Sequence, residues 1–151
     1  MSDEGEVPDG AAEIIQHFLE NEHGFMSWLD VQLEDIEYGR AVLSVPFDEK
    51  LTNPTDPPSM HGGVASTLID TAGGLALRPM LDEPIDGSMA TINLNVNYLQ
   101  PATTDLVATA EVVRAGSTVG VSTVTVESET LDGTVEPVAV GQGAYRLFHD
   151  G

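Results

Sequence analysis

The run from His61 to Arg78, HGGVASTLIDTAGGLALR, constrains this chain more than any other segment, because it is apolar and carries a single carboxylate. Between Gly62 and Leu77 the only charged residue is Asp70, and alanine and glycine alternate with larger apolar residues. An unpaired buried carboxylate is costly, so a chain neutralises it, pairs it or uses it. The run predicts a buried central helix that ends at Pro79 and whose Asp70 has a chemical function.

Helix geometry separates Asp70 from the start of this helix. Asp70 follows His61 by nine positions, which places it about 180° around the helix and roughly 13 Å further along the axis. Gly62 and Gly63 leave the first-turn N–H groups accessible, and the helix dipole there favours a carbonyl or phosphate oxygen. If both ends serve one reaction, an antiparallel second copy must bring its Asp70 to Gly62. The spacing therefore predicts a two-fold dimer with shared sites.

Composition predicts one folded domain with a surface of unusual charge. The chain has 151 residues, is 41% hydrophobic and contains no cysteine, which excludes disulfides and a thiol nucleophile. No apolar run is long enough for a membrane span, and the acidic start MSDEGEVPDG does not resemble a signal peptide. We expect a cytoplasmic protein, with a disordered acidic segment over residues 1–9 and a single domain over residues 10–151.

The charge balance is extreme, with 25 acidic residues against five basic ones and a formal net charge of −20. The acidic residues are spread along the chain, which indicates an acidic surface and not an acidic tail. Such a surface stops repelling itself in molar salt, where the Debye length is about 3 Å. We therefore favour adaptation to a high-salt, halophilic cytoplasm over an ordinary acidic protein. Nucleic-acid binding is not expected, because no basic stripe is present.

Hydrophobic periodicity predicts the remaining elements. Apolar residues at helical spacing predict a first helix over residues 11–22, with Asp9 as its cap. Alternating residues predict strands over 28–36, 41–47, 91–98, 104–114, 118–130 and 138–147, with a proline-containing loop over 48–60. In the strand over 91–98, Ile92, Leu94, Val96 and Tyr98 are assigned to the core face and Thr91 to the polar face. The element order favours an α+β protein, with an antiparallel sheet wrapped around the central helix.

The motif residues resemble a known family. They comprise Asn53, His61-Gly62-Gly63, Asp70, Thr91 and the strand end Asn97-Tyr98-Leu99-Gln100-Pro101-Ala102. Together they resemble the hotdog-fold acyl-CoA thioesterases of the PaaI-like, phenylacetate-pathway type, over roughly residues 29–147. The resemblance implies hydrolysis of an acyl- or aryl-CoA thioester by a homodimer or homotetramer, without a metal or cofactor.

The resemblance also implies a role for each site residue. The Gly62 amide would polarise the thioester carbonyl, while Asp70 of the partner subunit would act as general base or nucleophile. Asn53 would assist the carbonyl, His61 would orient its surroundings, and Thr91 would position water or Asp70. Gly63 and Arg114 are the expected substrate-binding residues, and Arg114 would contact the coenzyme A phosphates.

Several alternatives remain open at this point. His-Gly-Gly alone is also found as a flexible helix start, Asp70 could face solvent, and Thr91 could be an ordinary polar strand residue. A hotdog hydratase or dehydratase would need a His and an acid placed for proton transfer on the acyl chain, and no such pair is evident. A non-catalytic acyl-CoA-binding or ligand-sensing hotdog module is the alternative from another functional class. His17, His23 and His149 lack metal-ligand spacing, so no metal site is expected.

The net charge makes a prediction about salt. At about 0.1 M salt the Debye length of roughly 10 Å lets the acidic surface repel both polyanionic coenzyme A and a partner subunit. We therefore expect molar KCl to lower the KM for an acyl-CoA and to hold the oligomer together. The measurement is KM and molecular mass across a KCl series. A KM that rises steadily with salt, in an oligomer intact throughout, would show that a local basic patch outweighs the global charge.

Overall fold

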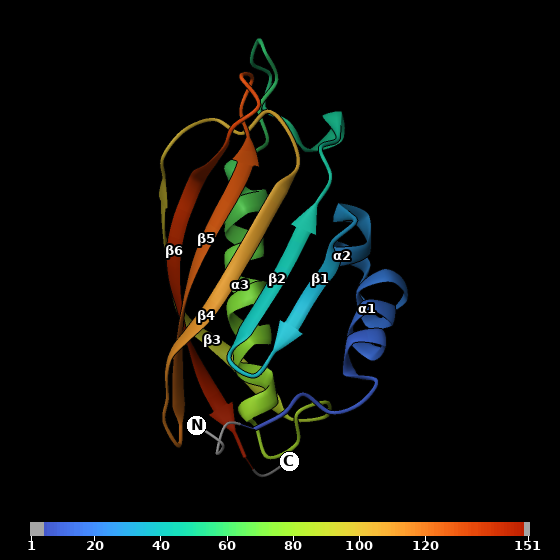
Figure 1. The fold of residues 1–151 in the computed structure, drawn as a ribbon, viewed down its shortest axis with the longest axis vertical. Coiled ribbons are helices and arrows are strands. Elements are labelled where there is room, and N and C mark those ends of the chain that lie inside the picture. The colour runs from blue at the N-terminus through green and yellow to red at the C-terminus, as the bar shows by residue number, and fades with distance from the viewer. Residues whose placement is uncertain (1–4, 150–151) are drawn as a thin grey trace.

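The computed structural model describes residues 5–149 and shows an antiparallel sheet curled around one long helix (Figure 1). The helices are α1 (Ala11–Asn21), α2 (Gly24–Leu29) and α3 (Gly62–Leu77), with 3-10 turns η1 (Glu49–Leu51) and η2 (Arg78–Met80). The strands are β1 (Gln32–Glu37), β2 (Arg40–Val45), β3 (Ser88–Tyr98), β4 (Leu106–Ala115), β5 (Val119–Glu129) and β6 (Val135–Phe148). Their order is β1-β2-β4-β5-β6-β3, and every neighbouring pair is antiparallel. The predicted α+β class and hotdog fold are confirmed.

Small residues allow α3 to lie close to the concave face of the sheet. Gly73 is fully enclosed, and a Cβ atom there would overlap the hydroxyl of Tyr145 on β6. The buried Ser122 on β5 donates a hydrogen bond to the Gly73 carbonyl oxygen at 2.9 Å. Around this contact Leu68, Ile69 and other apolar residues of α3 are fully buried against the sheet. The helix is therefore held by packing and by a hydrogen bond from β5.

The N-terminal prediction was wrong in two places. The segment predicted as a strand over residues 28–36 begins as α2, which ends at Asp30 in a left-handed conformation with φ 63°, and β1 starts only at Gln32. The alternation misled because Leu29 and Val31 are both buried, although they belong to a helix end and a connection. Asp9 does not cap α1; the N-cap is Gly10, with φ 80° and no side-chain hydrogen bond.

A β-bulge in β3 corrects the predicted faces of that strand. The register with β6 shifts between Thr91 and Asn93. A bulge reverses the alternation of side chains. Thr91 therefore faces α3, while Ile92 is 58% exposed. Tyr98 stays on the face of Leu94 and Val96 but lies at the end of the strand, where it is 56% exposed. Of the residues assigned to the core, Leu94 and Val96 do pack against it.

Residues 5–9 form neither helix nor strand. The predicted disordered segment over residues 1–9 lies partly outside the described residues. Within residues 5–149, no helix is long and apolar enough to cross a membrane. Both described ends of the chain lie at the same end of the molecule, near η2 (Figure 1).

The contact between α3 and the sheet predicts different effects for two adjacent glycines. Gly73→Ala places a methyl group against the Tyr145 hydroxyl. We expect it to lower the free energy of unfolding by about 1–3 kcal/mol, as overpacking does, even though alanine favours a helix by about 1 kcal/mol. Gly74→Ala is the matched control, because its Cβ would lie 3.3 Å from the flexible Met89 Sδ. Chemical denaturation at fixed molar KCl measures both variants, and equal stabilities would contradict this packing.

Candidate active site

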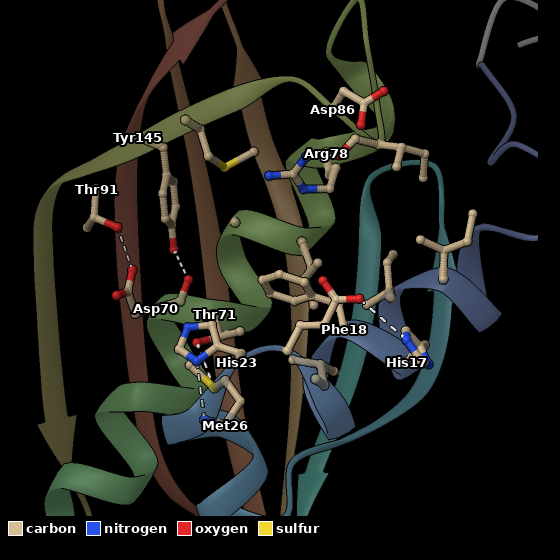
Figure 2. Close-up of a pocket in the computed structure, with 18 residues that line it drawn as sticks. His17, Phe18, His23, Met26, Asp70, Thr71, Arg78, Asp86, Thr91 and Tyr145 are labelled. Carbon is tan, nitrogen blue, oxygen red and sulfur yellow. Dashed lines mark hydrogen bonds and ion pairs between the residues drawn. The ribbon is translucent and has the colours of Figure 1, made fainter.

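Asp70 lies on the wall of a pocket and not inside the core. Its side chain is partly exposed, which corrects the expectation of a fully buried carboxylate. Thr91 Oγ1 donates a hydrogen bond to Asp70 Oδ1 at 2.7 Å (Figure 2). This bond orients the carboxylate and leaves Oδ2 available to the pocket. Thr91 thus lies beside Asp70.

Tyr145 fixes the main chain of Asp70 and was missed by the sequence analysis. Its buried hydroxyl donates to the Asp70 carbonyl oxygen at 2.7 Å (Figure 2). Burial, together with the nearby charge of Asp70, raises the pKa of Tyr145, so the hydroxyl stays protonated as a donor. Thr91 and Tyr145 are direct partners in the β3–β6 register. One cross-strand pair therefore holds both the side chain and the backbone of Asp70.

One feature of the sequence could have revealed Tyr145, namely a tyrosine close to a glycine in a predicted strand. A buried tyrosine needs a partner for its hydroxyl, and Tyr145 lies two residues after Gly143 in the strand predicted over residues 138–147. A Cβ at Gly143 would overlap the Tyr145 hydroxyl, as one at Gly73 would. The Tyr145 hydroxyl therefore fits into the core only because Gly73 and Gly143 carry no Cβ atom.

The start of α3 forms a second polar site. His61 is the N-cap, and its Nδ1 accepts the Gly63 N–H at 2.8 Å. The Gly63 N–H is thus already used, whereas within residues 5–149 the Gly62 N–H has no hydrogen-bond acceptor. Tyr98, also missed, donates from its hydroxyl to the Gly62 carbonyl oxygen at 3.0 Å. Gly62 therefore presents an open N–H at the positive end of the helix dipole.

The predicted site residues fall into two separate pockets. Asn53, His61 and Gly62 line one of about 350 Å³. Asp70 and Thr91 line another of about 680 Å³. Because Asp70 lies eight residues after Gly62, about 12 Å along the helix axis, the structure does not bring the two groups together within one chain.

Arg114, the residue expected to contact the coenzyme A phosphates, lies away from both pockets. Arg114 lies near the end of β4 that is opposite Leu106, and it lines neither pocket. Eight strand residues span about 26 Å, so Arg114 is far from Gly62 in the same chain. Within residues 5–149, no group of three or more His, Cys, Asp or Glu side chains is arranged to hold a metal ion.

Comparisons with known proteins agree with this fold. A family model described as the thioesterase superfamily matches residues 58–134. A candidate esterase of Halobacterium salinarum is 49% identical over 145 residues, which cover 94% of this chain and 95% of that protein. The human acyl-coenzyme A thioesterase 13 is 28% identical over 88 residues, which cover 57% of this chain and 59% of that protein.

A solved structure supports the same assignment. A thioesterase family protein from Silicibacter pomeroyi superposes with a TM-score of 0.77 at 26% identity, covering 92% of this chain and 98% of that one. The matched family segment includes Gly62, Asp70 and Thr91, the residues around which the two pockets are built. The chain therefore belongs to the thioesterase superfamily and is a thioester hydrolase.

Proposed function

We propose that this enzyme hydrolyses acyl-CoA thioesters, as the PaaI-like thioesterases do, at sites shared between two subunits. The observation that carries the proposal is that α3 places two different reactive groups in two different pockets. An open Gly62 N–H lies in one pocket, and a carboxylate oriented by Thr91 lies in another. An antiparallel second copy would bring the two groups to one substrate.

The proposed reaction is general-base hydrolysis. The thioester carbonyl oxygen accepts the Gly62 N–H, which stabilises the negative charge that develops there, typically by about 3–4 kcal/mol. Asp70 of the partner subunit removes a proton from a water molecule as its oxygen adds to the carbonyl carbon. The tetrahedral intermediate expels coenzyme A as a thiolate, which takes that proton. The free acid and coenzyme A are the products.

The edge of the sheet supports a dimer. Within residues 5–149, β3 pairs with β6 on one side and has no strand on the other. An eleven-residue edge strand with Ile92 and Tyr98 exposed is an aggregation hazard unless another strand covers it. We propose that β3 of a second copy covers it about a two-fold axis. The interface would then lie beside Thr91 and Asp70.

The proposed setting is a cytoplasm of high salt. The net charge of −20 supports it, as does the 49% identical relative from Halobacterium salinarum. High salt would also screen the repulsion between two acidic subunits and between the enzyme and coenzyme A.

Hydrolysis should depend on the carboxylate of Asp70. Asp70→Asn keeps its size and its bond from Thr91 but removes the base, so we expect kcat to fall at least about 10²-fold while the fold survives. Asp82→Asn is the matched control, because Asp82 is exposed, lines neither pocket and forms an ion pair with His149 at 3.3 Å. The assay measures release of coenzyme A from phenylacetyl-CoA and octanoyl-CoA. Unchanged turnover in Asp70→Asn would exclude the mechanism, and substrate binding without wild-type turnover would favour a ligand-sensing module.

Sharing of the site should appear in mixed dimers. Gly62→Pro removes the N–H at a helix position that tolerates proline, and Gly62→Ala is its control because it adds similar crowding against Tyr98 but keeps the N–H. Mixing inactive Asp70→Asn and Gly62→Pro subunits should restore up to about a quarter of wild-type activity, because half of the dimers are mixed and each has one intact site. Folded mixed dimers that stay inactive would place the whole site within one subunit.

A further inference from the structure

The Asp70 pocket continues along one face of α3 well beyond the carboxylate. Asp70, Thr71, Gly74, Leu75 and Arg78 line it in sequence, a spacing that forms a stripe on one side of a helix. The stripe runs for about 12 Å from Asp70 to Arg78. Its volume of about 680 Å³ is within the range of small-molecule sites. The pocket is therefore larger than an attacking water requires.

The wall opposite α3 is apolar and comes from the N-terminal helices (Figure 2). Its apolar residues are Ile14, Ile15, Phe18, Leu19 and Met26, and His17, Glu22 and His23 add polar groups at its edge. Phe18 stands edge-on to the His23 ring, with 5.7 Å between ring centroids. Ile85 and Met89 add apolar surface from the β3 side. An apolar group that enters from Asp70 would thus be buried between α1 and α3.

Gly74 keeps the middle of the pocket open. A Cβ atom there would lie 3.3 Å from Met89 Sδ and 3.5 Å from Tyr145 Cε2, so any longer side chain would extend into the space between these residues and α1. Gly74 is one helical turn after Asp70, about 6 Å along the axis. A bulky residue at this position would cut the pocket in half.

Arg78 closes the far end. Its Nη1 donates to the carbonyl oxygens of Pro84, Ile85 and Gly87 at 3.0, 3.1 and 2.9 Å, which fixes the guanidinium against the loop before β3. Burial lowers the pKa of Arg78, and the charge of Asp86 opposes this change. A methylene chain that reached this group would desolvate a charge, which is unfavourable. The pocket thus favours apolar groups up to Arg78 and not beyond.

We infer that this pocket binds the acyl group of the substrate, and that the acyl group is compact and apolar, either aromatic or of short to medium length, with Gly74 and Phe18 as the residues that select it. The inference rests on the proposed acyl-CoA hydrolysis. Coenzyme A itself does not suit the pocket, because the three carboxylates of Glu22, Asp70 and Asp86 outnumber the single guanidinium of Arg78 and would repel its phosphates. The thioester carbonyl lies at Asp70, and the acyl group extends towards Arg78.

A substrate series tests the length limit. With acetyl-, hexanoyl-, octanoyl-, phenylacetyl- and palmitoyl-CoA in molar KCl, kcat/KM should rise by about fourfold for each methylene buried and stop rising once the chain reaches Arg78. Palmitoyl-CoA should therefore be no better than octanoyl-CoA, and phenylacetyl-CoA should be a good substrate. A kcat/KM that continues to rise to palmitoyl-CoA would overturn the inference.

Two variants test the selecting residues. Gly74→Leu should lower kcat/KM for octanoyl- and phenylacetyl-CoA at least about tenfold more than it lowers kcat/KM for acetyl-CoA. Phe18→Ala should lower kcat/KM for phenylacetyl-CoA about tenfold, because it raises KM and leaves kcat nearly unchanged. The matched control is Phe25→Ala, because Phe25 is exposed to a similar degree (52% against 46% for Phe18) but does not line the pocket. Equal losses for all substrates, or equal effects of the two phenylalanine variants, would overturn the inference.

These outcomes are distinct from a failure of the proposed function. If the wild type cleaves none of the five thioesters, acyl-CoA hydrolysis itself is wrong. If it cleaves them without the length limit or the variant pattern, hydrolysis stands and the acyl group lies elsewhere. Circular dichroism of each variant shows whether it is folded, and Phe18→Ala carries the test if Gly74→Leu does not fold.

Discussion

The hydrogen bond from the Tyr145 hydroxyl to the Asp70 carbonyl joins the sheet to the central helix at the proposed catalytic residue. It requires close approach of α3 and β6, which Gly73 and Gly143 permit because neither carries a Cβ. The bond from Thr91 to the Asp70 carboxylate comes from the strand next to Tyr145. Stability and orientation therefore depend on the same contact, since the packing that encloses the helix also holds the proposed base.

The sequence was sufficient to predict the elements that depend on periodicity. The apolar run after His61 specified the central helix. The number of residues between Gly62 and Asp70 showed that the two lie apart on this helix, and in the structure they line two different pockets. It could not reveal the bulge beside Ile92, because a bulge is a property of the pairing with β6 and reverses which residues face inward. It also missed α2, whose six residues are too few to show a helical period.

The few basic side chains have specific tasks. Arg40 pairs with Asp35 at 3.0 Å, and Arg78 holds the loop before β3. Lys50 lies 4.6 Å from the centre of the Trp28 ring, and Arg146 lies 4.9 Å from that of Phe148. Each of these four cations is thus placed against a carboxylate, a carbonyl or an aromatic face. On an acidic surface, rare positive charges serve local structure, and solvent ions must do the remaining neutralisation.

The N-terminal helices lie outside the segment that matches the family model. The segment that matches the thioesterase superfamily, residues 58–134, contains Gly62, Asp70 and Thr91, whereas α1 and α2 lie before it. The chemical groups and the apolar wall that faces them thus belong to different parts of the chain. Substitutions in a short N-terminal segment could change the shape of the pocket while the reacting groups stay in place. This separation offers evolution a simple route to enzymes with one reaction and many acyl preferences.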